Sequence, residues 1–198
     1  PRVLSLLDKN PLSSTYGCFD RKYWHYKILD FPSGMQQELV MPLAFLWSQE
    51  FDANPFYAQP RIREYLQGIF AYHRRSMHSD GSLDDYFPCE RAYGATAYAL
   101  AALTEAALMT GLHSADDLKA FEKSGEFLAL YLESGTLSNH IAIAALALLN
   151  LSLLTEQSRW HEESLALITR LRSHQHAEGW FSEYGGCDPG YQTVTVEF

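Results

Sequence analysis

The sequence HSDGSLDDYFPCERAY, residues 78–93, recurs without a gap as HAEGWFSEYGGCDPGY, residues 176–191. His, Gly, Tyr, Cys and Tyr occupy matching places in the two copies, and acidic residues match at further places. A looser copy lies near the start of the chain, where we align Tyr16, Cys18, Asp20, Arg21 and Tyr23 with Tyr86, Cys89, Glu90, Arg91 and Tyr93. Self-similarity of this kind indicates a repeated supersecondary unit.

Helical stretches of two kinds alternate around this loop. Residues 60–77, 115–133 and 158–175 are apolar on one face, which is typical of a helix half exposed to solvent. Residues 92–109 and 139–154 are apolar on nearly every face, which is typical of a helix buried among neighbours. We therefore expect inner helices to begin near residues 35, 92, 138 and 191, with an outer helix between each pair.

Local signals mark several helix ends. Gly111 is expected to end one helix and Ser114 to cap the next. Pro42 is expected to kink a helix over residues 36–49. The segment QTVTVEF at residues 192–198 has strand propensity, but we expect a helix because its counterpart after Tyr93 has a helical pattern.

This alternation predicts an all-α fold of repeated helical hairpins that form an incomplete α/α toroid, with inner helices around an axis and outer helices facing water. An open α-solenoid is the alternative. Residues 1–198 are expected to form a single domain. Because four inner helices are fewer than a closed ring needs, we expect the natural protein to continue beyond Phe198.

Composition excludes several function classes. The formal net charge is −9 and no block of Lys or Arg is present, which argues against nucleic acid and membrane surfaces as partners. The apolar run at residues 142–154 is too short for membrane insertion. Three cysteines and the absence of a leader predict a cytoplasmic location. No cofactor or metal is expected, because no Cys-x-x-Cys or His-x-x-x-His spacing occurs, and apolar packing in the loops is expected to explain all three thiols.

The helical alternation resembles that of the α/α-toroid proteins, which have two branches. One branch processes polysaccharides and includes heparinase II/III-like, alginate-lyase-like and six-hairpin glycosidase proteins. The other contains terpenoid cyclases and prenyltransferases, whose Gln-x-x-x-Gly-x-Trp motif is approached by residues 175–180, QHAEGW. Residues 80–85 read DGSLDD in place of the Asp-x-Asp-Asp motif of protonating cyclases, which argues against terpene chemistry. Residues 16–34 are similar to proteins found beside bacterial exopolysaccharide genes.

In a toroid the outer-to-inner loops lie at one rim, where inner-helix N-termini add partial positive charge. The resemblance implies a lyase that acts on a uronate-containing glycan, because Asn, His and Tyr form the catalytic set of heparinase-like and alginate-lyase-like toroids. We assign Asn139 and Arg91 to the sugar carboxylate, His140 as the base, and Tyr191 or Tyr93 as the acid. An N-cap with a packed imidazole is the structural alternative for Asn139 and His140.

Further rim residues are expected to contact a poly- or oligosaccharide. These substrate-binding candidates are Arg21, Tyr23, Trp24, His25, Lys27, Glu90, Trp180 and Asp188. A glycoside hydrolase would instead pair two carboxylates from among Asp85, Glu90, Glu183 and Asp188, although loop-fixing roles explain the recurrence of these acids. A glycan-binding or assembly module without catalysis is the alternative from another class, and a terpenoid-cyclase-like site is a third.

Overall fold

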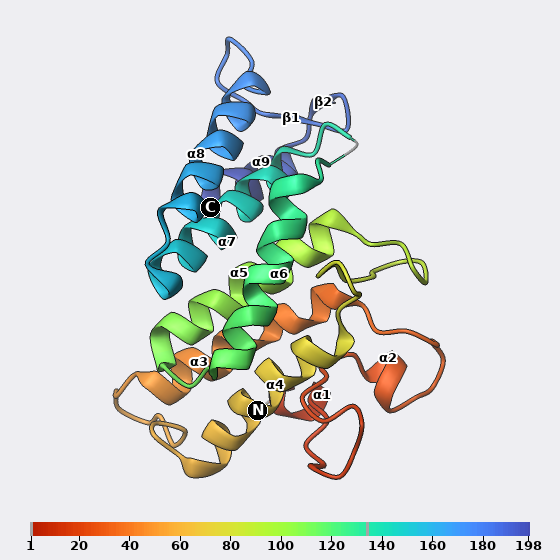
Figure 1. The fold of residues 1–198 in the computed structure, drawn as a ribbon, viewed down its shortest axis with the longest axis vertical. Coiled ribbons are helices and arrows are strands. Elements are labelled where there is room, and N and C mark those ends of the chain that lie inside the picture. Colours follow the sequence, from red (N-terminus) through yellow and green to blue (C-terminus); the bar gives the residue numbers. More distant parts are fainter. Residues whose placement is uncertain (1, 134) are drawn as a thin grey trace.

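The computed structural model describes residues 2–133 and 135–198 and confirms an all-α fold (Figure 1). The helices are α1 (Arg2–Leu6), α2 (Arg21–Trp24), the 3-10 helix η1 (Gly34–Leu39), α3 (Val40–Ser48), α4 (Pro60–Ser76), α5 (Tyr93–Thr110), α6 (Ala115–Leu130), α7 (Ser138–Thr155), α8 (Ser158–Ser173) and α9 (Pro189–Glu197). Two short antiparallel strands, β1 (Ser182–Glu183) and β2 (Gly186–Cys187), lie in the loop before α9.

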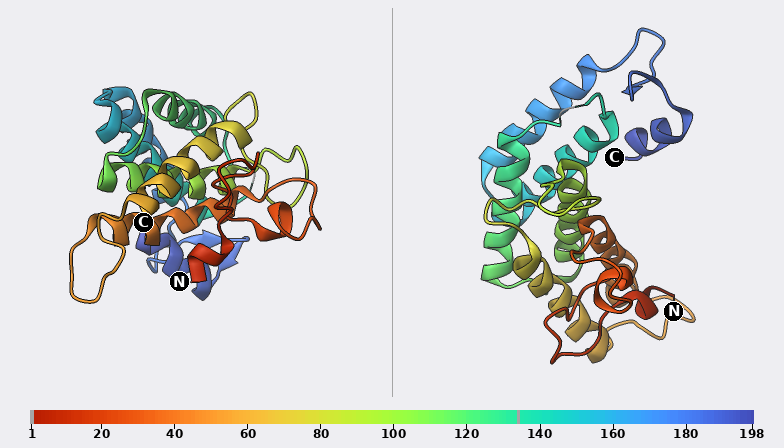
Figure 2. Two further views of the ribbon diagram at one scale, coloured as in Figure 1. Left: turned by 90° about the horizontal axis from the view of Figure 1, so that it is seen from below. Right: turned by 90° about the vertical axis from the view of Figure 1, so that its right-hand side faces the viewer.

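The helices form two curved layers. Helices α3, α5, α7 and α9 pack side by side in chain order, and α4, α6 and α8 lie behind them. The right-hand view of Figure 2 shows the resulting elongated, curved molecule, with the two ends of the chain far apart. Inner helices therefore begin at residues 34, 93, 138 and 189, close to the expected positions.

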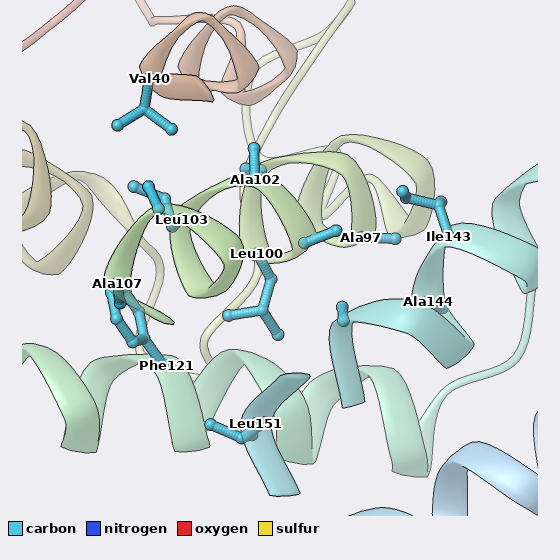
Figure 3. Packing of buried hydrophobic residues seen from close by; sticks show 14 of the residues in the cluster. Val40, Ala97, Leu100, Ala102, Leu103, Ala107, Phe121, Ile143, Ala144 and Leu151 are labelled. Carbon is cyan, nitrogen blue, oxygen red and sulfur yellow. The ribbon is translucent and has the colours of Figure 1, made fainter. Parts of the chain in front are cut away.

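Alanine explains the close packing of the inner layer. Ala97 of α5 and Ala144 of α7 are buried near Leu100 and Leu151, and Ala102 is buried on the side of α5 that faces Val40 (Figure 3). Small side chains let the two backbones approach, and the larger ones fill the space between them. Each fully buried Leu or Phe contributes about 1.5–3 kcal/mol to the free energy of folding.

Helix α7, Ser138–Thr155, is the one helix of the described residues that is long and apolar enough to cross a membrane. In this fold it packs between α5, α8 and α9, and most of its length is buried in the protein. Burial within the two layers accounts for its composition.

The caps predicted at residues 111 and 114 are confirmed. Gly111 ends α5 in a left-handed conformation with φ 65°, and Ser114 forms a capping box with Asp117 at the start of α6. Arg74 Nη1 lies 2.6 Å from Asp117 Oδ1, so this cap also joins α4 to α6. The C-terminal residues form helix α9 as expected, and not a strand.

The helix expected over residues 36–49 changes geometry just before Pro42. The chain forms the 3-10 helix η1 and then α3, so the change in geometry comes before Val40. Pro42 lies in the first turn of α3, where backbone N–H groups lack an intrahelical partner in any case. A proline there removes no hydrogen bond from the helix.

Two glycines fix the corners between the layers. Gly17 and Gly81 have φ values of 95° and 91°, and a Cβ on either would lie 2.2 Å or 2.3 Å from a carbonyl oxygen of the next outer helix, at Gly68 or Lys123. Gly179 has the same conformation, with φ 97°. The fold therefore aligns Gly17 with Gly81 and Gly179, in place of the alignment of Cys18 with Cys89.

The thiols differ in environment. Cys18 is buried, as expected for apolar packing, but Cys89 and Cys187 are exposed. The prediction for these two cysteines is wrong because both lie in the outer part of a corner loop, where no further layer covers them. Burial raises the pKa of the Cys18 thiol to about 11.

Candidate functional site

A cleft of about 300 Å³ lies where three outer-to-inner loops meet the starts of α5, α7 and α9. Asp85, Tyr86 and Glu90 come from the first full copy of the repeated loop, and Tyr184 and Tyr191 come from the second. The two copies therefore lie at one rim, as expected. Tyr93, Asn139, His140 and Tyr191, which are four of the five predicted catalytic residues, line this cleft.

His140 is held by a carboxylate that the sequence did not point to. Its Nδ1 lies 2.6 Å from Glu133 Oε2. Because a carboxylate only accepts, Nδ1 carries the hydrogen, and the tautomer that this bond selects has its lone pair on Nε2. No described residue forms a hydrogen bond with this Nε2. The arrangement is that of a general base oriented by an acid.

Gly94 makes room for the imidazole ring. A Cβ at Gly94 would lie 2.5 Å from His140 Cε1 and 2.7 Å from Nε2, so the ring sits directly on the backbone of α5. The ring of Tyr98 packs edge-on against the imidazole at a centroid distance of 6.2 Å. Together with Glu133, these contacts fix the ring orientation.

Asn139 has its polar atoms occupied within the protein. Its backbone N–H and its amide Nδ2 donate to the two carboxylate oxygens of Glu183, at 2.6 Å and 3.0 Å. Its Oδ1 accepts from the hydroxyl of Tyr98 at 3.0 Å. The residue is buried and anchors the start of α7, in place of the predicted contact with a substrate carboxylate.

The two predicted tyrosines differ in availability. The hydroxyl of Tyr93 donates to the carbonyl oxygen of Leu128 at 3.4 Å, and burial raises the pKa of Tyr93. Tyr191 is 39% exposed at the mouth of the cleft, and its ring lies 5.2 Å from that of Tyr184. A hydrogen bond with Tyr191 and then burial raise the pKa of Tyr184 to about 12. Of the two predicted tyrosines, Tyr191 is therefore the more accessible.

The four acids considered for glycoside hydrolysis hold the loops together. Glu90 Oε2 accepts from the backbone N–H groups of residues 85–87 at 2.8–3.2 Å, and Asp188 caps α9 by accepting from residues 190 and 191. Glu183 is buried at the start of α7, and Asp85 accepts from the hydroxyl of Ser33 at 2.6 Å. Glu90 and Asp188, which were also substrate-binding candidates, thus have loop-fixing contacts.

Arg91, the fifth predicted catalytic residue, lies beside the cleft. It lines an adjoining cavity of about 340 Å³, which shares Glu90, Tyr93 and Glu133 with the cleft. Its guanidinium pairs with Asp80, and its side chain is 52% exposed. The lining of the cleft itself, in the part of the chain that the structure describes, contains carboxylates and His140 but no Lys or Arg.

The remaining substrate-binding candidates lie outside the cleft. Arg21 lines a separate cavity, described below, and Trp24 Nε1 donates to the carbonyl oxygen of Leu6 at 2.8 Å. His25 packs on the ring of Trp24, and Lys27 lies over the ring of Tyr23. Trp180 stacks on His176 with the ring centroids 4.4 Å apart.

Within residues 2–133 and 135–198, no group of three or more His, Cys, Asp and Glu side chains is arranged to hold a metal ion. The groups that line the cleft are an imidazole, phenols and carboxylates. Comparisons with protein-family models, curated proteins and solved structures found no match for this chain.

Proposed function

We propose that this chain is a carbohydrate-active protein of polysaccharide metabolism, that its helices form part of an α/α toroid, and that it acts as a lyase on a uronate-containing glycan. The observation that carries the proposal is the pairing of His140 with Glu133 in a cleft whose mouth holds Tyr191. The repeated corners support the toroid, because each turns the chain from an outer helix to an inner one at the same rim.

In this proposal His140 Nε2 removes the proton beside the carboxylate of the sugar, and Glu133 stabilises the imidazolium that forms. The C–O bond to the leaving sugar breaks as a C=C bond forms. Tyr191 donates its hydroxyl proton to the leaving oxygen. General acid–base catalysis of this kind contributes about 10²–10⁴-fold to a rate.

The sugar carboxylate must also be neutralised for the proton to be removed. Arg91 lines the adjoining cavity, and it would exchange Asp80 for the substrate. The charged side chains that the described lining contributes besides His140 are carboxylates, which favours a second candidate function, a glycan-binding module without catalysis. Its aromatic mouth, with Tyr86 and Tyr184 largely exposed, would then only hold a sugar chain.

Incubation with a panel of uronate-containing polysaccharides separates the two functions. A lyase forms an unsaturated product that absorbs in the ultraviolet, whereas a module binds a polysaccharide and leaves its length unchanged. Binding is measured by calorimetry on the same panel. If the protein neither cleaves nor binds any polysaccharide of the panel, both functions are refuted.

A further inference from the structure

A second cavity, of about 610 Å³, lies beside the cleft, between the first loop and η1. Two cations, Arg21 and Lys22, line it together with the aromatic rings of Tyr26, Phe31 and Tyr86. Flat aromatic faces and a guanidinium are the groups that hold a ring bearing a negative charge. The lining thus differs from that of the cleft, where the charged groups apart from His140 are carboxylates.

The two cations of this cavity, Arg21 and Lys22, have no carboxylate partner among the described residues. Arg21 Nε is buried and has no hydrogen-bond partner among the same residues, and its guanidinium carbon lies 4.9 Å from the ring centroid of Tyr26. A buried N–H of a cation that lacks a partner is expected to gain from an anionic acceptor.

The two carboxylates in the lining are already bonded. Asp20 accepts from the backbone N–H groups of Lys22 and Ser33, each at 3.0 Å. Asp85 accepts from the hydroxyl of Ser33 at 2.6 Å. Because these carboxylate oxygens fix the loop and do not pair with Arg21 or Lys22, the two cations can bind a ligand.

The cavity and the cleft share Met35, Asp85 and Tyr86, so they are adjoining parts of one rim. We propose that the cavity binds a sugar ring that carries a carboxylate, sulfate or phosphate group, with Arg21 and Lys22 on the anion and the aromatic rings on the sugar face. That this sugar ring lies next to the sugar unit bound in the cleft rests on the proposed function. The binding of an anionic sugar in the cavity does not depend on that function.

The test is titration of the protein with glucuronate, glucose 6-sulfate, glucose 6-phosphate and glucose, followed by calorimetry or by amide chemical shifts. At least one anionic sugar is expected to bind with shifts at residues 19–36, while glucose binds much more weakly. The three anions distinguish which charged group fits. Equal binding of glucose would overturn the proposal.

Variants locate the site. Arg21→Gln is expected to weaken the binding of the anionic sugar by about 10-fold or more, as loss of a charge-assisted hydrogen bond does. Lys22→Gln is a second test should Arg21→Gln fail to fold. Arg63→Gln removes one charge from an exposed position of α4 and serves as the matched control. Equal affinities of Lys22→Gln, Arg21→Gln and Arg63→Gln would overturn the proposal.

Two further results separate this site from the proposed function. His140→Gln is expected to bind the anionic sugar with unchanged affinity, because His140 does not line the cavity. Binding of the anionic sugar without cleavage of any polysaccharide would leave the cavity assigned and reject the lyase. Cleavage at the same rate by the wild type, Arg21→Gln and Lys22→Gln would support the lyase and reject the assignment of the cavity.

Discussion

Substitution of the corner glycines tests how the two helical layers are joined. Gly81 and Gly179 share a positive φ, 91° and 97°, but differ in surroundings. A Cβ at position 81 would lie 2.3 Å from the carbonyl oxygen of Lys123 in α6, whereas, adjacent residues apart, no atom of the described chain lies within 4 Å of a Cβ at position 179. Gly81→Ala and Gly179→Ala are therefore a matched pair.

The expected losses follow from these two environments. A non-glycine residue held at such a φ costs about 1–3 kcal/mol, which applies to both variants. At position 81 the methyl group must also push the loop away from α6, which costs about a further 1–3 kcal/mol. The separation breaks the bond from Ser124 Oγ to the Gly81 carbonyl oxygen, 2.7 Å long. Gly81→Ala is thus expected to lose about 2–6 kcal/mol and Gly179→Ala about 1–3 kcal/mol.

Urea unfolding followed by far-ultraviolet circular dichroism measures the loss in free energy of unfolding for both variants, with the same dependence on urea concentration assumed for each. Gly17→Ala is expected to behave like Gly81→Ala, because its Cβ would lie 2.2 Å from the carbonyl oxygen of Gly68. Equal losses for Gly81→Ala and Gly179→Ala would refute the claim that the corner glycines are required by contact with the next outer helix.

Three other predictions concern the core and the site. Burial lowers the pKa of His73 from 6.5 to about 4, against a smaller opposing effect of Asp117, so the unfolded chain binds the proton first. Stability should fall by up to roughly 3 kcal/mol as the pH drops from 6.5 toward 4, and His73→Gln should flatten this fall in urea titrations at several pH values. Trp160 is 1% exposed and packs on Gly125, so Trp160→Ala should lower the free energy of unfolding by about 3–5 kcal/mol. A loss no larger than that of a substitution at an exposed site would disprove its packing role. Glu183→Gln places an amide against the two donors of Asn139 and should cost about 1–3 kcal/mol, with increased hydrogen exchange at the start of α7; unchanged exchange there would contradict the anchoring role.

The pattern of residue types was sufficient to predict the helices and their order. Apolar side chains on every face of residues 92–109 and 139–154 placed α5 and α7 inside, because only a helix surrounded by others tolerates that composition. The first loop was aligned by its cysteine, but the fold requires glycine at the corner. The signal that finds this alignment is Gly followed three residues later by Asp, at Gly17-Asp20 and Gly81-Asp84.

The chemistry of the cleft was predicted less fully. His140 and Tyr191 were found because they begin inner helices. Glu133 was missed because it lies in a loop that is not a copy of the repeated one, and its contact with His140 depends on how closely α6 ends beside α7. The burial of Asn139 depends on Glu183, 44 residues away in the sequence, which no local pattern reveals.

The most direct test of the central claim is the rate at which unsaturated product forms from uronate polysaccharides with the wild-type protein and with His140→Gln. His161→Gln, at an exposed position of α8, is the control. The account predicts cleavage by the wild type and the control, and a rate lower by about 10²–10⁴-fold for His140→Gln. Cleavage by His140→Gln at the wild-type rate, or no cleavage by the wild type, would contradict the role of His140 as the base.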